Sequence, residues 1–147
     1  MNHRILMSLL ALTSAALLSS AGSRAVHAAP SIAIVPITRD GQASPDANGS
    51  FPTFFDYGEP FLNDSGQVVF SCRLVLTAGG SADNEVLVRG RGGSAPVLIA
   101  REGQAIPDGP GLFGGLQGVI RQYAMNDSGR VVFVAPLTGT AGGTSDN

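Results

Sequence analysis

Acidic side chains recur at matched places in two similar segments of the chain, and they are the residues best suited to chemistry. Asp40 corresponds to Glu102, and Asp46 corresponds to Asp108. Two carboxylates can hydrolyse a glycosidic bond without a histidine, so a hydrolytic enzyme is one interpretation. However, each acid recurs in both segments, whereas a catalytic pair normally occurs once per site, and the chain has no Trp for stacking on sugars. We therefore expect these acids to have structural roles.

A calcium site is a second interpretation of the same region. The sequence DANGS at 46–50 places side-chain oxygens at alternate positions, as in loops that wrap Ca²⁺. The equivalent segment DGPGL at 108–112 keeps only the aspartate, and neither copy has a glutamate at the twelfth position. Because Asp and Gly also favour turns by themselves, we prefer a turn without a metal.

The basic residues and histidines exclude a large part of enzyme chemistry. All nine basic residues are Arg, and both histidines, His3 and His27, lie in a leader that we expect to be removed. The remaining chain would have no Lys and no His, which excludes Ser-His-Asp and Cys-His systems, Schiff-base lysines and imidazole zinc sites. Its seven Arg against eleven acidic residues give a net charge of −4, which argues against nucleic-acid binding.

The first 28 residues have the features of a secretory signal peptide. A short cationic start, MNHR, precedes an apolar run at 5–18, and Val26 and Ala28 supply the small residues that precede a cleavage site after Ala28. The apolar run is shorter than the roughly 20 residues that span a bilayer. The sequence therefore predicts an exported protein, secreted or located in the cell envelope.

The single cysteine, Cys72, has no partner for an internal disulfide. It lies in the strand-like sequence VVFSCRLVL, where a buried small hydrophobic residue is the expected role. A reactive thiol would need electropositive neighbours, and only Arg73 is adjacent in sequence.

The chain contains two copies of one long sequence pattern. The offset between the copies is 62 residues at the start of the pattern and 63 after a one-residue insertion. Self-similarity at a fixed period is typical of repeat architectures, in which a single unit cannot bury its own hydrophobic face. The matching segments are RDGQASPDANGSF (39–51) with REGQAIPDGPGLF (101–113), NDSGQVVF (63–70) with NDSGRVVF (126–133), and TAGGSADN (77–84) with TAGGTSDN (140–147).

The repeat suggests three parts: a signal peptide at 1–28, a first repeat region at 29–84 and a second at 85–147. Asn84 is followed by the strand-like sequence EVLVR, for which the second copy has no counterpart after Asn147. The sequence therefore predicts a chain that ends in mid-repeat, either as a fragment of a longer tandem array or as a truncated reading frame.

Short apolar segments bounded by glycine-rich turns predict an all-β fold with antiparallel strands. The expected strands lie at 67–76, 85–89 and 95–100, which gives three or four short strands per unit. No segment after the leader keeps the 3.6-residue period of a helix. The tetrapeptide NDSG predicts a hairpin corner: a type I turn that ends on a left-handed Gly, with the Asn side chain bonded to the turn backbone.

The recurring Asn, Gly, Val and Phe of these hairpins carry a family resemblance. With the upstream sequence Arg-x-Gly-Gln-Ala-x-Pro-Asp, the chain resembles the bacterial secreted tandem-repeat proteins named for an NxxGxxVF motif, many of which end in a sorting anchor of variable type. The resemblance implies a location outside the cell or in the envelope and a propeller-like β array, here an incomplete one of about two units. It implies no established activity. The absence of a C-terminal anchor from the sequence fits a truncated member. The motif residues are Asn63, Gly66, Val69 and Phe70, then Asn126, Gly129, Val132 and Phe133.

The remaining aromatic, glycine and arginine patterns suggest structure more than chemistry. An aromatic cluster could be an exposed binding stripe, but we expect it to be core; it contains Phe51, Phe54, Phe55, Tyr57 and Phe61. We expect Arg39 and Arg101 to form ion pairs within their own repeat, or hydrogen bonds to turn carbonyls. Gly-Gly pairs occur at 79–80, 92–93, 114–115 and 142–143, and none precedes a helix pattern or a Lys, so we expect turns.

These observations predict an exported structural or interaction protein without catalytic activity and without catalytic, cofactor-binding or metal-binding residues. Two alternatives stay open: a carbohydrate-active or other hydrolytic β-propeller fragment that uses Asp and Glu, and a calcium-stabilised adhesion module. The expected partners are other repeats of a longer parent, or a second chain through open strand edges. The segment 130–137 provides such an edge because it lacks the partner that 85–89 supplies in the first copy. We expect no nucleic acid and no membrane span in the mature chain; a glycan or protein partner is left open.

Overall fold

The described part of the protein is built from short antiparallel strands, and the all-β fold class is confirmed. This computed structural model describes residues 33–53, 56–116 and 123–145, which belong to the compact unit Ala33–Asn147. The predicted signal peptide, Phe54 and Phe55 lie outside the described residues. Within them there is no α-helix, and no helix has the length and apolar character needed to cross a membrane. The elements are β1 (Phe61–Leu62), β2 (Gln67–Arg73), η1 (Gly80–Ala82), β3 (Glu85–Arg91), β4 (Val97–Arg101), β5 (Leu112–Phe113), β6 (Tyr123–Met125), β7 (Val131–Phe133), β8 (Leu137–Thr138) and η2 (Gly143–Ser145).

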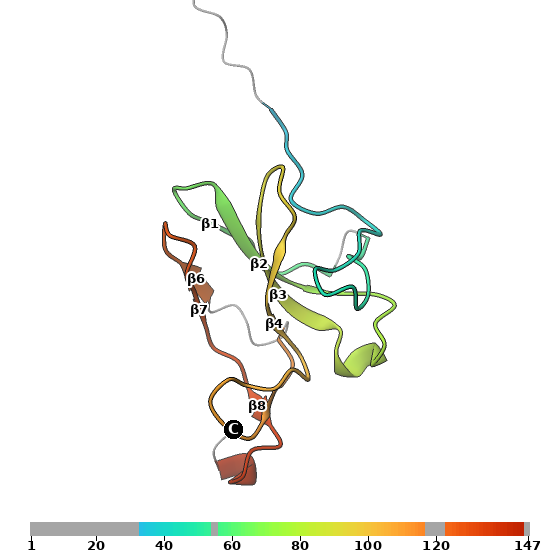
Figure 1. The fold of residues 1–147 in the computed structure, drawn as a ribbon, viewed down its shortest axis with the longest axis vertical. Helices are drawn as coiled ribbons and strands as arrows, with labels where there is room; N and C mark the ends of the chain where they lie inside the picture. The colour runs from blue at the N-terminus through green and yellow to red at the C-terminus, as the bar shows by residue number, and fades with distance from the viewer. Residues whose placement is uncertain (1–32, 54–55, 117–122, 146–147) are drawn as a thin grey trace, which may run out of the picture. The chain divides into compact units, whose positions relative to one another are not determined.

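The first sheet contains β1, β2, β3 and β4, and each strand pairs antiparallel with the next (Figure 1). β2 and β3 pair along their whole length, from Gln67 opposite Arg91 to Arg73 opposite Glu85. The segment 85–89 therefore pairs with the strand before it, as expected. Because the sheet continues on both sides of residue 84, our boundary between the two repeat regions falls inside one sheet.

The strand expected at 67–76 ends earlier, at Arg73. Val75 forms an isolated bridge with Ser50, in the loop that precedes the sheet. Leu76 then has a φ of 60°, which lies in the left-handed region where a side chain is strained. The apolar run VLTA continues the pattern of a strand in sequence, but its backbone turns away from the sheet.

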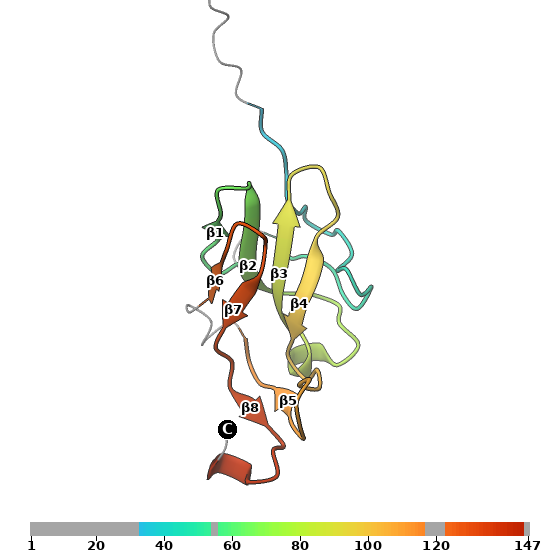
Figure 2. The same cartoon turned by 60° about the vertical axis from the view of Figure 1, so that its left-hand side comes forward.

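The second copy forms two small sheets. β6 and β7 make a hairpin, and β5 pairs with β8 (Figure 2). β7 pairs only with β6 within the described residues, so its other edge is open there. The open edge predicted for 130–137 is wrong for the end of that segment, because Pro136 accepts the N–H of Gly114 and Leu137 pairs with Phe113.

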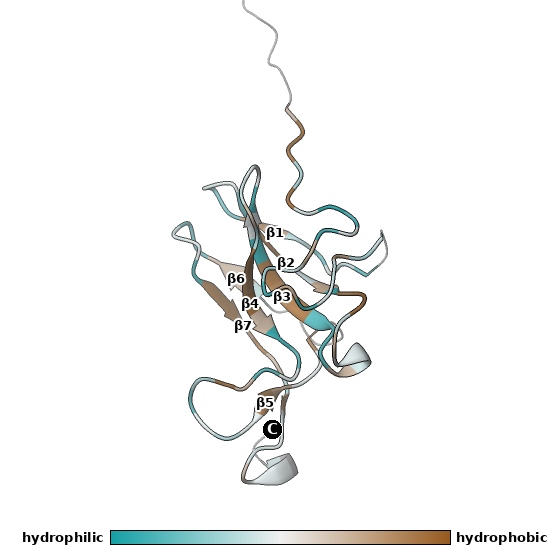
Figure 3. Cartoon of the chain, turned by 45° about the vertical axis from the view of Figure 1, so that its right-hand side comes forward, coloured by the Kyte–Doolittle hydropathy of each residue, from teal (hydrophilic) through white to brown (hydrophobic). Residues whose placement is uncertain are grey.

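Two hydrophobic cores lie on opposite faces of the first sheet. Successive side chains of a strand point to opposite faces, so Phe70 and Cys72 share one core with Phe51, whereas Val69 belongs to the other. Met125 and the half-buried Phe133, on the second-copy hairpin, complete that second core. The hairpin thus covers one face of the first sheet, and the hydrophobic colouring concentrates on the strands of both copies (Figure 3).

The aromatic cluster is core only in part. Phe51 is fully buried, and the half-buried Tyr57 ring lies 5.8 Å from the ring of Phe70. Phe61 is 38% exposed, so the expectation of core is wrong for it. β1 is an outer strand of the sheet, so Phe61 has a paired strand on one side only.

Cys72 is fully buried, as predicted. Burial raises the pKa of its thiol to about 12, because the thiolate would lose its hydration. The thiol is therefore protonated at neutral pH, in the state that reacts poorly.

Three of the four Gly-Gly pairs lie in or beside turns, but the pair at 114–115 does not. Gly114 donates its backbone N–H to the carbonyl of Pro136 across 2.8 Å, in an extended segment that follows β5. A Cβ atom on Gly115 would lie 3.1 Å from a carboxylate oxygen of Glu85. These glycines permit a close approach of two segments, so the expectation of a turn is wrong for them.

Candidate functional site

The two NDSG turns have the same local geometry, and it is the predicted one. Asn63 Oδ1 accepts the backbone N–H of Gln67 at 2.8 Å, and Asn126 Oδ1 accepts that of Arg130 at 2.9 Å. Gly66 and Gly129 have φ values of 75° and 81°, in the left-handed region that suits glycine. The hairpin corners between β1 and β2 and between β6 and β7 are therefore set by the tetrapeptide itself.

The two turns also contact each other directly. Asn63 Nδ2 donates to the backbone carbonyl of Asn126 at 2.8 Å, and Ser65 Oγ donates to that of Asp127 at 2.8 Å. The backbone N–H of Asp64 donates to the Asp127 carboxylate at 3.2 Å. The same side chain of Asn63 thus closes its own turn with its oxygen and binds the next turn with its nitrogen.

Gly129 fits closely against the first sheet. A Cβ atom at this position would lie 2.6 Å from Gln67 Oε1 and 2.8 Å from Arg89 Nη1. Arg89 donates a hydrogen bond to the Gly129 carbonyl. A Cβ atom on Gly66, the equivalent glycine of the first copy, would meet nothing within 4 Å. Only the second glycine is constrained by a neighbouring unit.

Apolar packing joins the same two units beneath the turns. Val69, Leu87 and Ala100 of the first sheet are fully buried under the second-copy hairpin, where Met125 is 6% exposed. Fully burying a Val or Leu side chain stabilises a fold by roughly 1.5–3 kcal/mol. The interface between the copies is therefore a hydrophobic core and not a surface contact.

The upstream loops of the two copies also share their hydrogen bonds. The backbone N–H groups of Arg39 and Arg101 each donate to the Gln side chain three residues later, at 3.1 Å in both cases. Phe51 and Phe113 each accept the N–H of the loop glycine, at 3.0 and 2.8 Å. The motif Arg-x-Gly-Gln-Ala-x-Pro-Asp thus defines a loop closed by its own glutamine.

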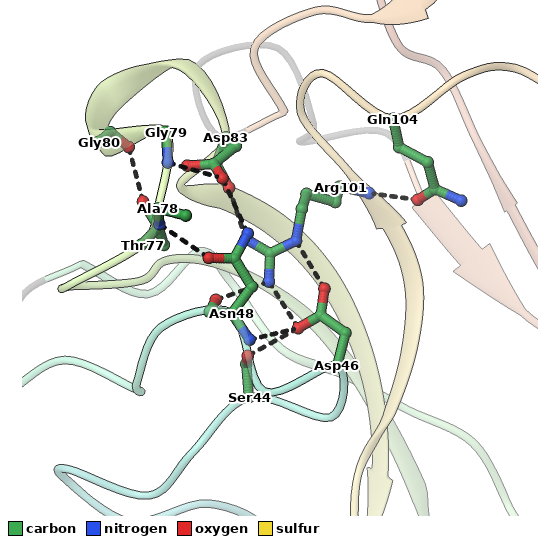
Figure 4. A network of polar contacts seen from close by, with 10 residues as sticks. All are labelled: Ser44, Asp46, Asn48, Thr77, Ala78, Gly79, Gly80, Asp83, Arg101 and Gln104. Carbon is green, nitrogen blue, oxygen red and sulfur yellow. Dashed lines mark hydrogen bonds and ion pairs between the residues drawn. The ribbon is translucent and has the colours of Figure 1, made fainter.

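Arg101 links this loop of the second copy to the loop of the first (Figure 4). Its guanidinium donates from Nε to Asp46 Oδ2 at 2.8 Å and from Nη2 to Asp46 Oδ1 at 2.7 Å, a bidentate ion pair. It also donates to the carbonyls of Asn48 and Asp83, and the residue is 6% exposed. The expectation of an ion pair within one repeat is wrong for Arg101, because its partner is the aspartate of the other copy; the expected bonds to turn carbonyls are present.

The residues around this ion pair are fixed by further hydrogen bonds. Asn48 Nδ2 donates to Asp83 at 2.8 Å, and Asn48 Oδ1 accepts the N–H of Ala78 at 2.8 Å. Hydrogen bonds from Thr77 and Asn48 lower the pKa of Asp83. Burial by itself would raise the pKa of Asp46, but its hydrogen bonds from Arg101 and Ser44 outweigh this effect, so its pKa is lowered. Both carboxylates are ionised at neutral pH.

Residues 6–147 match a family that is described only as a family of unknown function, DUF7453. The chain belongs to this family. No curated protein and no solved structure matches it. The matched residues of this DUF7453 member include both turns, both upstream loops and every residue of the network around Arg101.

The acidic pairs singled out in the sequence are not brought together in this DUF7453 chain. Asp46 binds Arg101, whereas its equivalent Asp108 and the other loop acid, Asp40, are exposed. Glu102 lies beside Glu85, and burial together with the Glu85 charge raises its pKa. Glu85 itself accepts a hydrogen bond from Arg73 at 2.7 Å. Within the described residues, no hydrogen bond joins either loop acid to its counterpart in the other copy.

The calcium interpretation of 46–50 meets a competing cation. Both carboxylate oxygens of Asp46 accept from Arg101, and the Asn48 side chain is bonded to Asp83 and Ala78. The described residues contain no group of three or more His, Cys, Asp or Glu that could hold a metal ion. These side chains form an arginine site instead of an oxygen cage.

Sequence reasoning missed that the repeated Arg and the repeated Asp pair across copies. The recurrence of both residues is compatible with a link between units, but it does not distinguish that link from an ion pair within one unit. Sequence reasoning also missed Asp83 and Arg89, which both contact the second copy. Asp83 lies in a repeated segment, 77–84, whereas Arg89 lies in the segment 85–89, which has no equivalent in the second copy.

Proposed function

We propose that this chain is an exported repeat module whose units act by packing on one another, in a structural or interaction role outside the cell or in its envelope, without catalysis. The observation that carries the proposal is the bidentate bond from Arg101 of the second copy to Asp46 of the first. Asp46 and Arg101, each of which recurs in the other unit, are engaged in joining the two units.

The NxxGxxVF motif also serves to join neighbouring units in this proposal. Asn63 and Gly66 shape the turn, and Asn63 also bonds to the next turn, while Val69 and Phe70 point to opposite faces of the sheet. The valine meets the following unit, and the phenylalanine packs with the upstream loop through Phe51. One short motif thus supplies both faces of a stacking unit, which supports a propeller-like array in which blades pack face to face.

Export rests on the leader at 1–28, and the absence of catalysis rests on the residue inventory. The test is to express the chain with its leader in a bacterial host and to determine the mass and N-terminus of the exported protein. We expect a chain that begins at Ala29 and hydrolyses none of a panel of polysaccharides and esters. A retained cytoplasmic chain with an intact leader, or a hydrolysis that Glu102→Gln abolishes, would overturn the proposal.

A further inference from the structure

Within the described residues, the face of the second-copy hairpin opposite the interface is exposed, whereas the opposite face of the first sheet packs on Phe51 and is exposed only beside β1. Val132 and Val134 of the second-copy hairpin are 68% and 56% exposed, and with Tyr123 and Ala124 they line a groove of about 280 Å³. Val132 is equivalent to Val69, which is fully buried by the second copy. The residue that joins the first unit to the second is therefore repeated on the second unit and faces solvent.

The matching face of the first copy is covered by Phe51 over β2 and β3, but it is exposed at β1. Leu62, which is equivalent to the buried Met125, is 64% exposed. Beside it lies a groove of about 250 Å³ that is lined mostly by apolar side chains, among them Tyr57, Val68 and Phe70. Phe70 and Val68 are equivalent to Phe133 and Val131, which pack against Val69 and Leu87 in the second core.

The charges at these two faces are complementary. Arg39 is equivalent to Arg101, and Asp108 is equivalent to Asp46, the two partners of the observed ion pair. Arg39 and Asp108 are both exposed, and neither has an ion-pair partner within the described residues. By the equivalence of the repeats, the arginine of the link belongs with the exposed region of the first copy, and the aspartate belongs with that of the second copy.

We propose that two copies of this chain associate head to tail, the first-copy face of one chain packing on the second-copy face of the other as the two units pack within a chain. Arg39 of one chain then binds Asp108 of the other, Val132 enters the groove beside Leu62, and Asn126 Nδ2 donates to the turn at 63–66. The proposal rests on the proposed function, because it extends the packing of units from one chain to two. A heterologous contact of this kind repeats until a ring closes or a filament grows.

The test is sedimentation velocity of the purified chain over a wide concentration range, with two charge-reversed variants. Arg39→Asp places an acid on the head face, and Asp108→Arg places a base on the tail face, so in either variant every head-to-tail contact joins like charges. We expect each variant alone to associate at least about tenfold more weakly than the parent chain. An equimolar mixture of the two variants should regain association, because each head then finds an opposite charge on a tail of the other variant.

Two more variants separate the face from other apolar surface. Val132→Asp should abolish association, whereas Leu76→Asp, at a residue that is 89% exposed and away from both grooves, should leave it unchanged. A parent chain that is monomeric at all concentrations, single charge variants that associate as the parent does, or a mixture that stays monomeric would each overturn the proposal. These results leave the proposed function standing if Arg101→Ala still destabilises the chain, so the two can fail separately.

Discussion

Val69 and Val132 stand at the same place in two nearly identical hairpins, yet the first is fully buried and the second is 68% exposed. Their turns have the same hydrogen bonds and the same left-handed glycine. Local geometry therefore depends on the tetrapeptide, whereas burial depends on whether another unit lies on the hairpin. Equivalent substitutions in the two copies should have unequal effects, and the inequality measures the contribution of the interface.

The arginine pair should show the largest inequality. Arg101→Ala removes a buried guanidinium, the cation of the Asp46 ion pair and the donor to two carbonyls, so we expect the free energy of unfolding to fall by about 3 kcal/mol. Arg39→Ala, at the exposed equivalent, should change it by no more than about 0.5 kcal/mol. Urea unfolding at pH 7 and at low protein concentration measures both. Equal losses would mean that the link between copies contributes nothing particular.

The valine pair follows. Val69→Ala creates a cavity between the first sheet and the second-copy hairpin, and we expect a loss of about 2 kcal/mol. Val132→Ala, on the open face, should cost less than about 0.5 kcal/mol. Thermal unfolding of dilute samples compares the two variants. A comparable loss at Val132 would show that its face is covered even in the monomer.

The glycine pair isolates the contact between turns. Gly66→Ala introduces only backbone strain at a φ of 75°, which costs roughly 1–2 kcal/mol. Gly129→Ala introduces the same strain and also brings a Cβ atom against Gln67 and Arg89, so its loss should be larger by about 1 kcal/mol. The difference between the two losses, from denaturant unfolding of each variant, is the useful quantity. A difference of zero would show that Gln67 and Arg89 move aside without cost.

The difference between the two copies also shows which structural features the sequence alone does not predict. The NDSG corner, the burial of Cys72 and three of the strands follow from local residue patterns, because turns and strand alternation depend on neighbours in the chain. The expectation for the Arg101 ion pair is wrong because two loops of similar sequence give no indication of whether an arginine reaches its own aspartate or that of the preceding unit. Phe61 was placed in the core, although its exposure depends on which strand ends at the sheet edge. The sequence did not predict the position of the neighbouring unit, which decides the partner of Arg101, or the order of strands in the sheet, which decides the exposure of Phe61.

The smallest expected effect is a pH dependence confined to one copy. The pKa of Asp46 is lowered in the folded state, so its ion pair stabilises the protein fully above the ordinary carboxyl range and is lost as the pH falls below about 4. Because the Asp46 side chain is 33% exposed, solvent screening limits the loss to about 1 kcal/mol. Asp46→Asn should therefore lower stability at pH 7 and flatten the decline between pH 4 and pH 2, measured by urea unfolding at each pH. Asp108→Asn, at the exposed equivalent, should leave both unchanged in dilute solution, and a flattened decline in that variant would contradict the assignment of the acid sensitivity to the link with Arg101.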